Sequence, residues 1–383
     1  MEKELSLYIH IPFCMSKCYY CDFISHENQE ECIIEKYIES LCKEILQNAE
    51  LLSERKIKTI YIGGGTPSFI DSKYIKMILE TIYMLTDKNN IEEITIEVNP
   101  CSMTLDKAKQ YYMLGINRVS VGLQTIYDDI LKIIGRKHTY KSFINTLKIL
   151  NKVGFNNISC DIIYPLPNLN LKLFKNEIDE IVSIKDKYNL KHISIYNLEV
   201  HENTKLAFLL QEGYVKLCDE DEEYDMRTYL NKKLQVAGFN KYEISNYSLT
   251  GYESKHNLIY WNQEEYLGLG VNSSSYINGT RYKNVSDINE YIDNIKNNKE
   301  ISIVEEEQDK LITMKEYAIL NLRKSEGINI NKFKRKFDTD IFSVFKTELD
   351  ELQKLELIKV NNQNIILSDR GEEVANQVFE KFI

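Results

Sequence analysis

Six strand-like runs alternate with helix-like segments over the first two-thirds of the chain. Each run is short and rich in β-branched or aromatic residues, and apolar residues at helical spacing follow it. The runs span residues 5–11, 58–62, 93–98, 118–122, 157–163 and 192–198. Because parallel strands need a crossover between them, this order predicts an α/β fold whose parallel sheet is wound or closed into a partial (β/α)6 TIM-like barrel.

Unusual residues follow these runs at their C-terminal ends. They are the cysteines of 14–21, the glycines of 63–65, Asn99-Pro100, Gln124 and Pro165. In barrels of this kind the loops at that end carry the chemistry. The sequence therefore predicts a functional site on one rim of the barrel.

The pattern changes after about residue 240. Strands are expected over 242–247 and 276–282, helices over 314–322, 333–337 and 342–355, and a short hairpin over 357–367. We therefore expect a barrel over 1–240, a β-containing extension over 241–300, and a smaller, mostly helical, winged-helix-like C-terminal domain over 301–383.

Charge and composition exclude several classes of protein. The 383 residues include 48 basic and 58 acidic ones, a formal net charge of −10 that disfavours a generic nucleic-acid binder. No run approaches the roughly 20 apolar residues of a membrane helix, and the first residues do not resemble a secretory signal. We expect a cytoplasmic protein with reduced cysteines, no membrane span and no nucleic-acid partner.

Cys14, Cys18 and Cys21 place three thiols in one short loop. Three thiolates would hold an iron–sulfur cubane and leave one iron open to another molecule. They would also form a zinc knuckle with His26 as the fourth ligand, or be incidental buried thiols. Spacing alone favours the cubane and leaves the other two interpretations open.

The segment Tyr8-Ile-His-Ile-Pro-Phe-Cys14-Met-Ser-Lys-Cys18-Tyr-Tyr-Cys21 resembles the cluster loop of radical S-adenosyl-L-methionine (SAM) proteins. More narrowly, the chain resembles oxygen-independent coproporphyrinogen III oxidase and the related heme chaperone, both of porphyrin metabolism. The other matching segments are 63–68, 97–100, 115–124, 135–138, Asp161, 367–371 and 376–379. The resemblance covers nearly the whole chain and implies a partial (β/α)6 barrel of the radical SAM type.

The resemblance implies two cofactors and an electron donor. Cys14, Cys18 and Cys21 would hold a [4Fe-4S] cluster, whose open iron would take the amino and carboxylate groups of SAM. An electron from the cluster would then cleave SAM to methionine and a 5′-deoxyadenosyl radical. The protein would position and shield these groups.

Further SAM contacts are implied residue by residue. Gly64, Gly65 and Thr66 would let the backbone approach the methionine end of SAM, although a tight turn would also use a glycine there. Because no Gly-Lys-Ser/Thr follows, this is not a phosphate-binding loop. Glu97 would pair with the ammonium or hydroxyl groups of SAM; its ordinary alternative is a solvated rim carboxylate.

A second SAM is implied only if the chain follows the oxidase. Gln124, Arg136 and Asp161 match the positions that contact it there, and Arg136 could equally pair with a nearby acid. Tyr8 and Tyr20 would pack beside the cluster and SAM, or serve as ordinary core aromatics.

Three features favour the chaperone over the oxidase. Phe23 stands where the oxidase loop has a further cysteine, and the chain enters its first strand at about Leu5 without the oxidase's N-terminal extension. The segment His256-Asn257-Leu-Ile-Tyr260-Trp261 matches the HNxxYW signature of the chaperone subgroup. His256 could ligate heme iron, although spacing alone favours a core histidine.

Two departures from the family concern the substrate mouth. Residues 272–275 lack a Gly and a His that relatives carry, and Pro165 replaces a Gly. The expected function is a heme chaperone that passes heme to respiratory acceptor proteins. The alternatives are an oxygen-independent coproporphyrinogen III oxidase and a zinc-bound interaction module, so whether the chain is an enzyme stays open.

Overall fold

The computed structural model describes residues 3–27 and 29–383. The predicted strands form the centre of its main sheet as β1 (Glu4–Ile11), β4 (Lys56–Gly64), β5 (Glu93–Val98), β6 (Arg118–Gln124), β7 (Ile158–Tyr164) and β8 (Leu190–Asn197). These strands pair in parallel in that order. The predicted α/β barrel is therefore confirmed.

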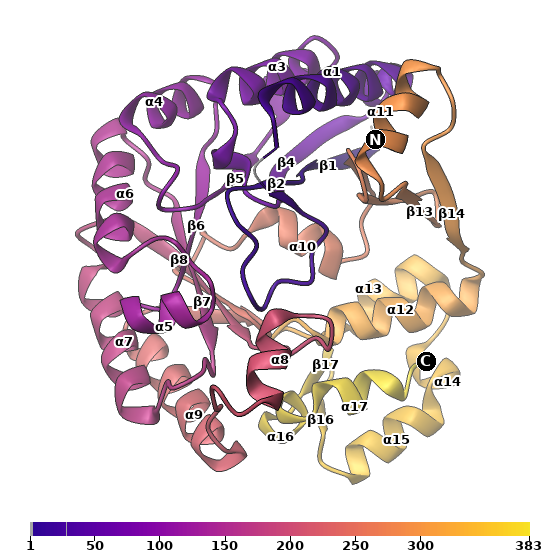
Figure 1. The fold of residues 1–383 in the computed structure, drawn as a ribbon. Helices are drawn as coiled ribbons and strands as arrows, with labels where there is room; N and C mark the ends of the chain where they lie inside the picture. The colour runs from indigo at the N-terminus through magenta and orange to yellow at the C-terminus, as the bar shows by residue number, and fades with distance from the viewer. Residues whose placement is uncertain (1–2, 28) are drawn as a thin grey trace.

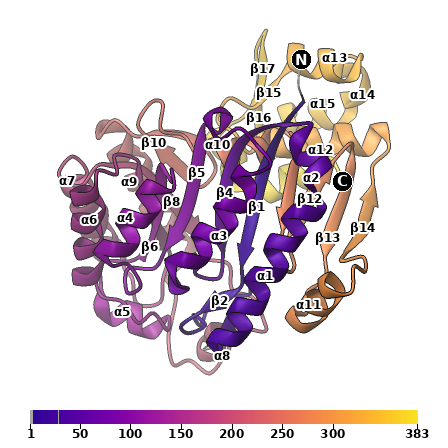
Figure 2. The same cartoon turned by 90° about the horizontal axis from the view of Figure 1, so that it is seen from above.

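Helices surround the sheet on its outer face (Figure 1). They are α1 (Glu31–Gln47), α2 (Ala49–Ser53), α3 (Ser72–Tyr83), α4 (Leu105–Met113), α5 (Asp128–Ile133), α6 (Tyr140–Val153), α7 (Leu171–Ile184) and α9 (Glu220–Val236). Helix α8 (Lys205–Gln211) lies instead at the mouth of the barrel (Figure 2). Side-chain caps fix the starts of several helices: Thr104 accepts from the N–H of Lys107, and Asp219 from that of Glu222. Asn170 caps α7 in the same way, accepting from the N–H of Leu173.

The sheet continues beyond the barrel strands at both edges. Beside β1 lie β11 (Tyr266–Leu269), β12 (Ser274–Ile277), β13 (Thr280–Asn284) and β14 (Ser302–Glu307); beside β8 lie β10 (Asn246–Ser248) and β9 (Asn240–Glu243). Helices α10 (Lys255–Trp261) and α11 (Ile288–Lys296) belong to the same stretch of chain. Residues 241–300 thus extend the barrel sheet itself.

Two expected single strands are wrong, because each is a pair of strands. The run 276–282 turns at Asn278-Gly279, where both residues have positive φ, as a tight hairpin turn requires. The run 242–247 likewise breaks between β9 and β10, which pair antiparallel.

A second apolar core lies near the C-terminus. It involves α12 (Lys310–Leu322), α13 (Ile330–Phe337), α14 (Ile341–Val344), α15 (Lys346–Lys354), α16 (Asp369–Glu373) and α17 (Ala375–Glu380), with a small sheet of β15 (Ile328–Asn329), β17 (Asn364–Leu367) and β16 (Ile358–Val360). The helix expected over 342–355 is wrong as a single element, because Phe345 leaves the helical conformation between α14 and α15. Its ring is buried against Phe382, with centroids 5.3 Å apart.

Figure 2 shows which end of the barrel holds which loop. The short strand β2 (Phe13–Cys14) and α8 lie together at the C-terminal ends of the barrel strands, while α10 lies toward their N-terminal ends. None of the helices in the described residues is long and apolar enough to cross a membrane.

Candidate cofactor site at the mouth of the barrel

The loop that carries the three predicted metal ligands lies across the mouth of the barrel (Figure 1). Strand β2 ends at Cys14 and pairs with β3 (His26–Glu27). Tyr19 ties the loop to two distant segments, because its N–H donates to the carbonyl of Ile134 at 2.9 Å and its carbonyl accepts from Leu206 at 2.8 Å. The loop is therefore held by the barrel rather than by its own sequence alone.

The thiols of Cys14, Cys18 and Cys21 are free and partly buried. Burial raises the pKa of the Cys14 and Cys21 thiols, and neighbouring thiolates of the trio raise both further. Cys14 Sγ also lies 3.5 Å from Thr66 Oγ1. Among the described residues, no three His, Cys, Asp or Glu side chains already form a metal-binding group.

The glycines at the end of β4 fit against this loop so closely that a side chain would collide with it. A Cβ on Gly65 would lie 2.9 Å from the carbonyl oxygen of Phe13 and 3.0 Å from Cys14 Sγ. A Cβ on Gly64, where φ is +111°, would lie 2.7 Å from the ring of His10. The chemistry of three free thiols beside this glycine cradle fits a cluster with a small ligand on its open side.

Glu97 lies near the C-terminal end of β5, where it is partly buried and bonded to the barrel wall rather than fully solvated. Its Oε1 accepts a 2.8 Å hydrogen bond from the hydroxyl of Tyr61. Burial raises the pKa of Glu97 to about 7, against hydrogen bonds from Tyr61 and the backbone of Gly64 that lower it. A Cβ on Gly63 would come within 3.0 Å of the same oxygen, so the glycine segment and this carboxylate adjoin.

Tyr20 connects the cysteine loop to Arg136. Its hydroxyl accepts from Arg136 Nη2 at 2.8 Å and from Nε at 3.1 Å. Arg136 forms no ion pair within the described part of the chain, so its main partner is this phenol rather than an acid. Asp161 instead accepts from Ser120 Oγ at 2.9 and 3.1 Å, and burial raises its pKa.

Gln124 and Tyr8 complete the predicted set. Gln124 ends β6 with a φ of 69°. Its Nε2 packs closely over Gly122, because a Cβ on that glycine would lie only 2.9 Å away from it. Tyr8 lies on β1, stacks on the ring of Tyr61 with centroids 6.3 Å apart, and shares a 3.0 Å hydrogen bond with His10 Nδ1. Both residues therefore belong to the barrel end that holds the cysteine loop and the glycines.

The inner wall of the barrel is polar, a feature that our sequence analysis missed. Strand neighbours at alternate positions are polar on six strands: Ser6, Tyr8 and His10; Thr59 and Tyr61; Thr95 and Glu97; Arg118 and Ser120; Ser159 and Asp161; His192, Ser194 and Tyr196. The intervening residues are apolar and form the core against the helices.

This alternation of polar and apolar residues along each strand could have been read from the sequence. Barrels that are packed shut carry branched apolar residues inside, so this one is suited to polar ligands.

Glu177 is another residue that the sequence analysis missed. It is fully buried on α7 and accepts from the N–H of Ile126 at 3.0 Å and the hydroxyl of Thr125 at 3.2 Å. These bonds fix the turn that follows Gln124. Burial raises the pKa of Glu177 to about 8.

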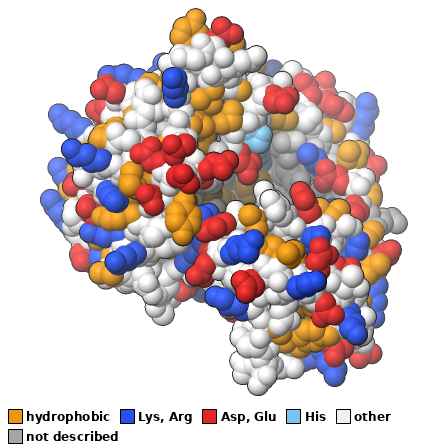
Figure 3. Space-filling model, turned by 90° about the horizontal axis from the view of Figure 1, so that it is seen from below, with side chains coloured by type: hydrophobic (Ala, Val, Ile, Leu, Met, Phe, Trp, Pro, Cys, Tyr) orange, Lys and Arg blue, Asp and Glu red, His pale blue; other side chains and the backbone are white. Residues whose placement is uncertain are grey.

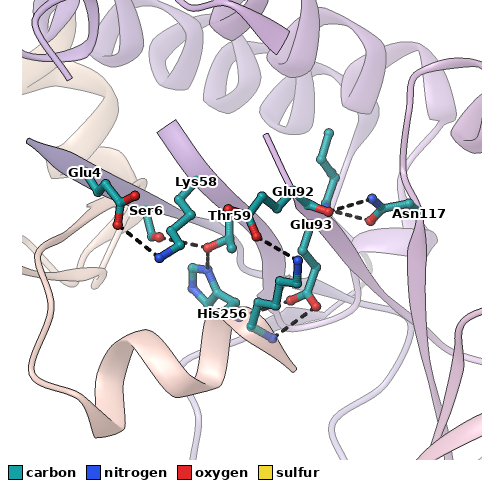
Figure 4. Close-up of polar contacts among 10 residues, drawn as sticks. Glu4, Ser6, Lys58, Thr59, Glu92, Glu93, Asn117 and His256 are labelled. Atoms are coloured by element: carbon teal, nitrogen blue, oxygen red, sulfur yellow. Dashed lines mark hydrogen bonds and ion pairs between the residues drawn. The ribbon is translucent and has the colours of Figure 1, made fainter. Parts of the chain in front are cut away.

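His256 lies away from this mouth, because its partners Thr59 and Glu93 stand near the N-terminal starts of β4 and β5. Figure 4 shows it beside Thr59. It is fully buried on α10, with Nδ1 2.7 Å from Thr59 Oγ1 and Nε2 2.7 Å from Tyr260 Oη. Its N–H donates to Glu93 Oε1 at 3.1 Å. Burial, with a contribution from Arg118, lowers the pKa of His256 to about 3, so the ring is neutral.

The two departures from the family pattern lie at different places, the first of them at a buried junction. The segment of residues 272–275 follows Gly270, whose N–H donates to Glu44 Oε2 at 2.7 Å. Ser273 Oγ donates to the carbonyl of Gly270 at 2.7 Å. Pro165 follows β7 on the rim of the barrel. Glu44 therefore joins this junction to α1.

Family comparisons agree with this geometry. The chain matches the Radical SAM superfamily over residues 8–181 and the HemN C-terminal domain over residues 310–372. Coproporphyrinogen III oxidase (HemN) from Escherichia coli shares the fold, with a TM-score of 0.85 over 100% of this chain and 90% of that one, at 19% identity. Fold and site together define a radical SAM protein.

Two curated relatives match over their full length. The heme chaperone HemW of Lactococcus lactis is 37% identical over 100% of this chain and 98% of its own, and that of Bacillus subtilis is 33% identical over 99% of both. The heme chaperone HemW of Escherichia coli is 32% identical over 70% of this chain and 68% of its own. The chain belongs to the HemW family.

Proposed function

We propose that this protein is a heme chaperone that binds a [4Fe-4S] cluster and SAM and transfers heme to acceptor proteins, including respiratory ones. The observation that carries the proposal is the full-length similarity to proteins named heme chaperone HemW. The exposed Phe23, in place of the oxidase's further cysteine, supports the same choice.

Cys14, Cys18 and Cys21 would hold the cluster, and an electron donor would reduce it. When bound, cluster and SAM together supply one-electron cleavage of the sulfonium. The chain's own task is to place SAM: Gly64, Gly65 and Thr66 would lie along its methionine end.

Other residues around the site would position or shield SAM. Glu97 would face its cationic groups, and Tyr8 and Tyr20 would shield cluster and ligand from water. Gln124, Arg136 and Asp161 would form the place for a second SAM.

Heme is the cargo, and we propose His256 as its axial ligand. A neutral imidazole is the ligating form of histidine, and a hydrogen bond at the other ring nitrogen orients a ligating ring. Thr59 supplies such a partner at Nδ1.

The remaining proposals concern the protein's location in the cell and its binding partners. The eight free cysteines suit a compartment that keeps thiols reduced, which supports a cytoplasmic location. Acidic and basic side chains are interspersed around a hollow on the face seen in Figure 3. With the net charge of −10 this supports protein and heme partners rather than nucleic acid.

The test is anaerobic reconstitution followed by hemin titration. We expect iron and sulfide to bind the wild type and to be lost in Cys14→Ala, with a heme spectrum that His256→Ala alters. The matched control is Cys101→Ala, an exposed cysteine outside the loop. Iron retained by Cys14→Ala would refute the cluster site, and robust formation of protoporphyrinogen from coproporphyrinogen III would favour the oxidase instead.

A further inference from the structure

The hydroxyl of Tyr260 occupies the ring nitrogen of His256 that a heme iron would need. Tyr260 Oη lies 2.7 Å from Nε2, and the two rings meet edge to face with centroids 5.0 Å apart. Because His256 and Tyr260 are four residues apart, both side chains lie on one face of α10. The spacing of the HNxxYW segment thus produces an internal partner for its own histidine.

The hydrogen bonds around His256 settle which nitrogen carries its proton. Thr59 has one hydroxyl proton, which it donates to Ser6 Oγ at 2.9 Å. It therefore accepts from His256 Nδ1 at 2.7 Å. Figure 4 marks the contact between these two side chains. This leaves the lone pair on Nε2, where it accepts from Tyr260. His256 Nε2 is therefore in the form that can ligate iron, but the hydroxyl of Tyr260 occupies it.

Both ends of α10 are held by other segments of the chain: Asn262, just after the helix, accepts from Lys324 Nζ at 2.7 Å, and Gln263 Nε2 donates to Glu316 at 2.8 Å. Glu93 accepts from the N–H groups of Lys255 and His256 at 3.1 Å each, and this carboxylate belongs to the barrel. At the other end, Tyr260 packs edge to face on Tyr266, with centroids 4.7 Å apart, and the ring of Tyr260 is only partly buried. A movement of Tyr260 therefore leaves the Thr59–His256 bond intact.

Open space adjoins this end of the barrel. A cavity of about 380 Å³ is lined by Ser6 and Lys58 from the barrel and by Ile259 and Gln263 from α10 and the residues just after it. Ser6 belongs both to this cavity and to the hydrogen-bonded chain that ends on His256. The cavity therefore adjoins α10 at Ile259, the residue before Tyr260.

We propose that Tyr260 is an internal competitor of heme: its hydroxyl holds His256 Nε2 closed, and heme ligation requires that hydroxyl to leave. This inference rests on the proposed function, since it takes His256 as the heme ligand. No bond other than the iron–nitrogen bond forms, and the displaced phenol keeps its proton. Heme loading is therefore coupled to a displacement of the Tyr260 side chain.

The test is hemin titration of the full-length protein, followed by absorption spectra and stopped-flow rates. Tyr260→Phe removes the competitor, so we expect faster loading and an affinity higher by about three- to tenfold, the worth of one buried hydrogen bond. The matched control is Tyr266→Phe, whose hydroxyl bonds Arg281 instead. It should load at the wild-type rate.

A second variant probes the other nitrogen. Thr59→Val removes the acceptor at Nδ1, which frees the ring to carry its proton on Nε2, so we expect weaker hemin binding. Tyr260→Phe and Thr59→Val must therefore change the affinity in opposite directions. Unchanged or weaker binding in Tyr260→Phe, with binding still lost in His256→Ala, would overturn the competitor alone. Wild-type binding in His256→Ala would overturn the heme ligand of the proposed function and this inference with it.

Discussion

Tyr61 donates its phenolic proton to Glu97 across neighbouring strands of the inner wall, at 2.8 Å. This bond is the main polar interaction that favours the ionised carboxylate, because burial works in the opposite direction. The charge of Glu97 near neutral pH thus depends on this hydroxyl group together with the backbone of Gly64 and the nearby Arg118.

SAM affinity should rise with pH through neutrality. The pKa of Glu97 is about 7, so the carboxylate is mostly protonated at pH 6 and mostly ionised at pH 8. Because SAM is a sulfonium cation, we expect its affinity to increase by up to about tenfold over that range. Calorimetry at several pH values measures this, and Glu97→Gln should flatten the profile. A flat wild-type profile would contradict the prediction.

Tyr61→Phe should move the same pH profile upward. Loss of the hydroxyl removes a hydrogen bond that lowers the pKa of Glu97, so a higher pH is needed to ionise it. We expect weaker SAM binding at pH 7 that recovers at higher pH. Tyr83→Phe is the control, since its hydroxyl bonds the carbonyl of Leu114 outside the barrel. An unmoved midpoint would rule out this role.

Two glycine variants should separate the cluster from its ligand. Gly65→Ala would press on Phe13 and Cys14, so we expect reduced iron content after reconstitution. Gly63→Ala would press on Tyr61 and Glu97, so we expect normal iron but weaker SAM binding. Iron analysis and SAM titration of the same preparations decide the matter; equal iron loss in both variants would show that the two positions are not distinct.

Glu177 should make the protein less stable as pH rises. Between the ordinary pKa of a glutamate and about 8, the folded protein keeps a proton that the unfolded chain releases. The free energy of unfolding should therefore fall by up to about 1.4 kcal/mol per pH unit over this interval. Denaturant melts of wild type and Glu177→Gln measure it. The variant should lack this slope, and parallel pH dependences would contradict the assignment.

Local patterns predicted the barrel strands and the loop that follows each. The bounds of α7 and the caps at Thr104 and Asp219 depend on neighbouring residues, so a single sequence is sufficient to place them. The turn at Asn278-Gly279 was equally local and was overlooked.

The surroundings of His256 could not be predicted in the same way. Its hydrogen bond to Thr59 joins residues 197 positions apart, and its contact with Glu93 joins residues 163 apart. The motif indicated a histidine beside aromatic residues, but only the fold places them at the end of the barrel opposite the cysteine loop. The anchoring of Tyr19 by Ile134 and Leu206 is similarly a product of tertiary structure.

The two faces of the barrel sheet have different roles: the inner face is polar and suited to polar ligands, and the outer face is apolar and packs against the helices. The outward side chains pack under the helices and form most of the apolar core that stabilises the fold. The inward side chains contribute less to that core. Substitutions that leave the buried hydrogen-bond partners of these side chains satisfied should alter what the barrel accepts while the outer core still holds the chain folded. Such a scaffold allows related chains to exchange one cargo or chemistry for another while the same outer shell persists.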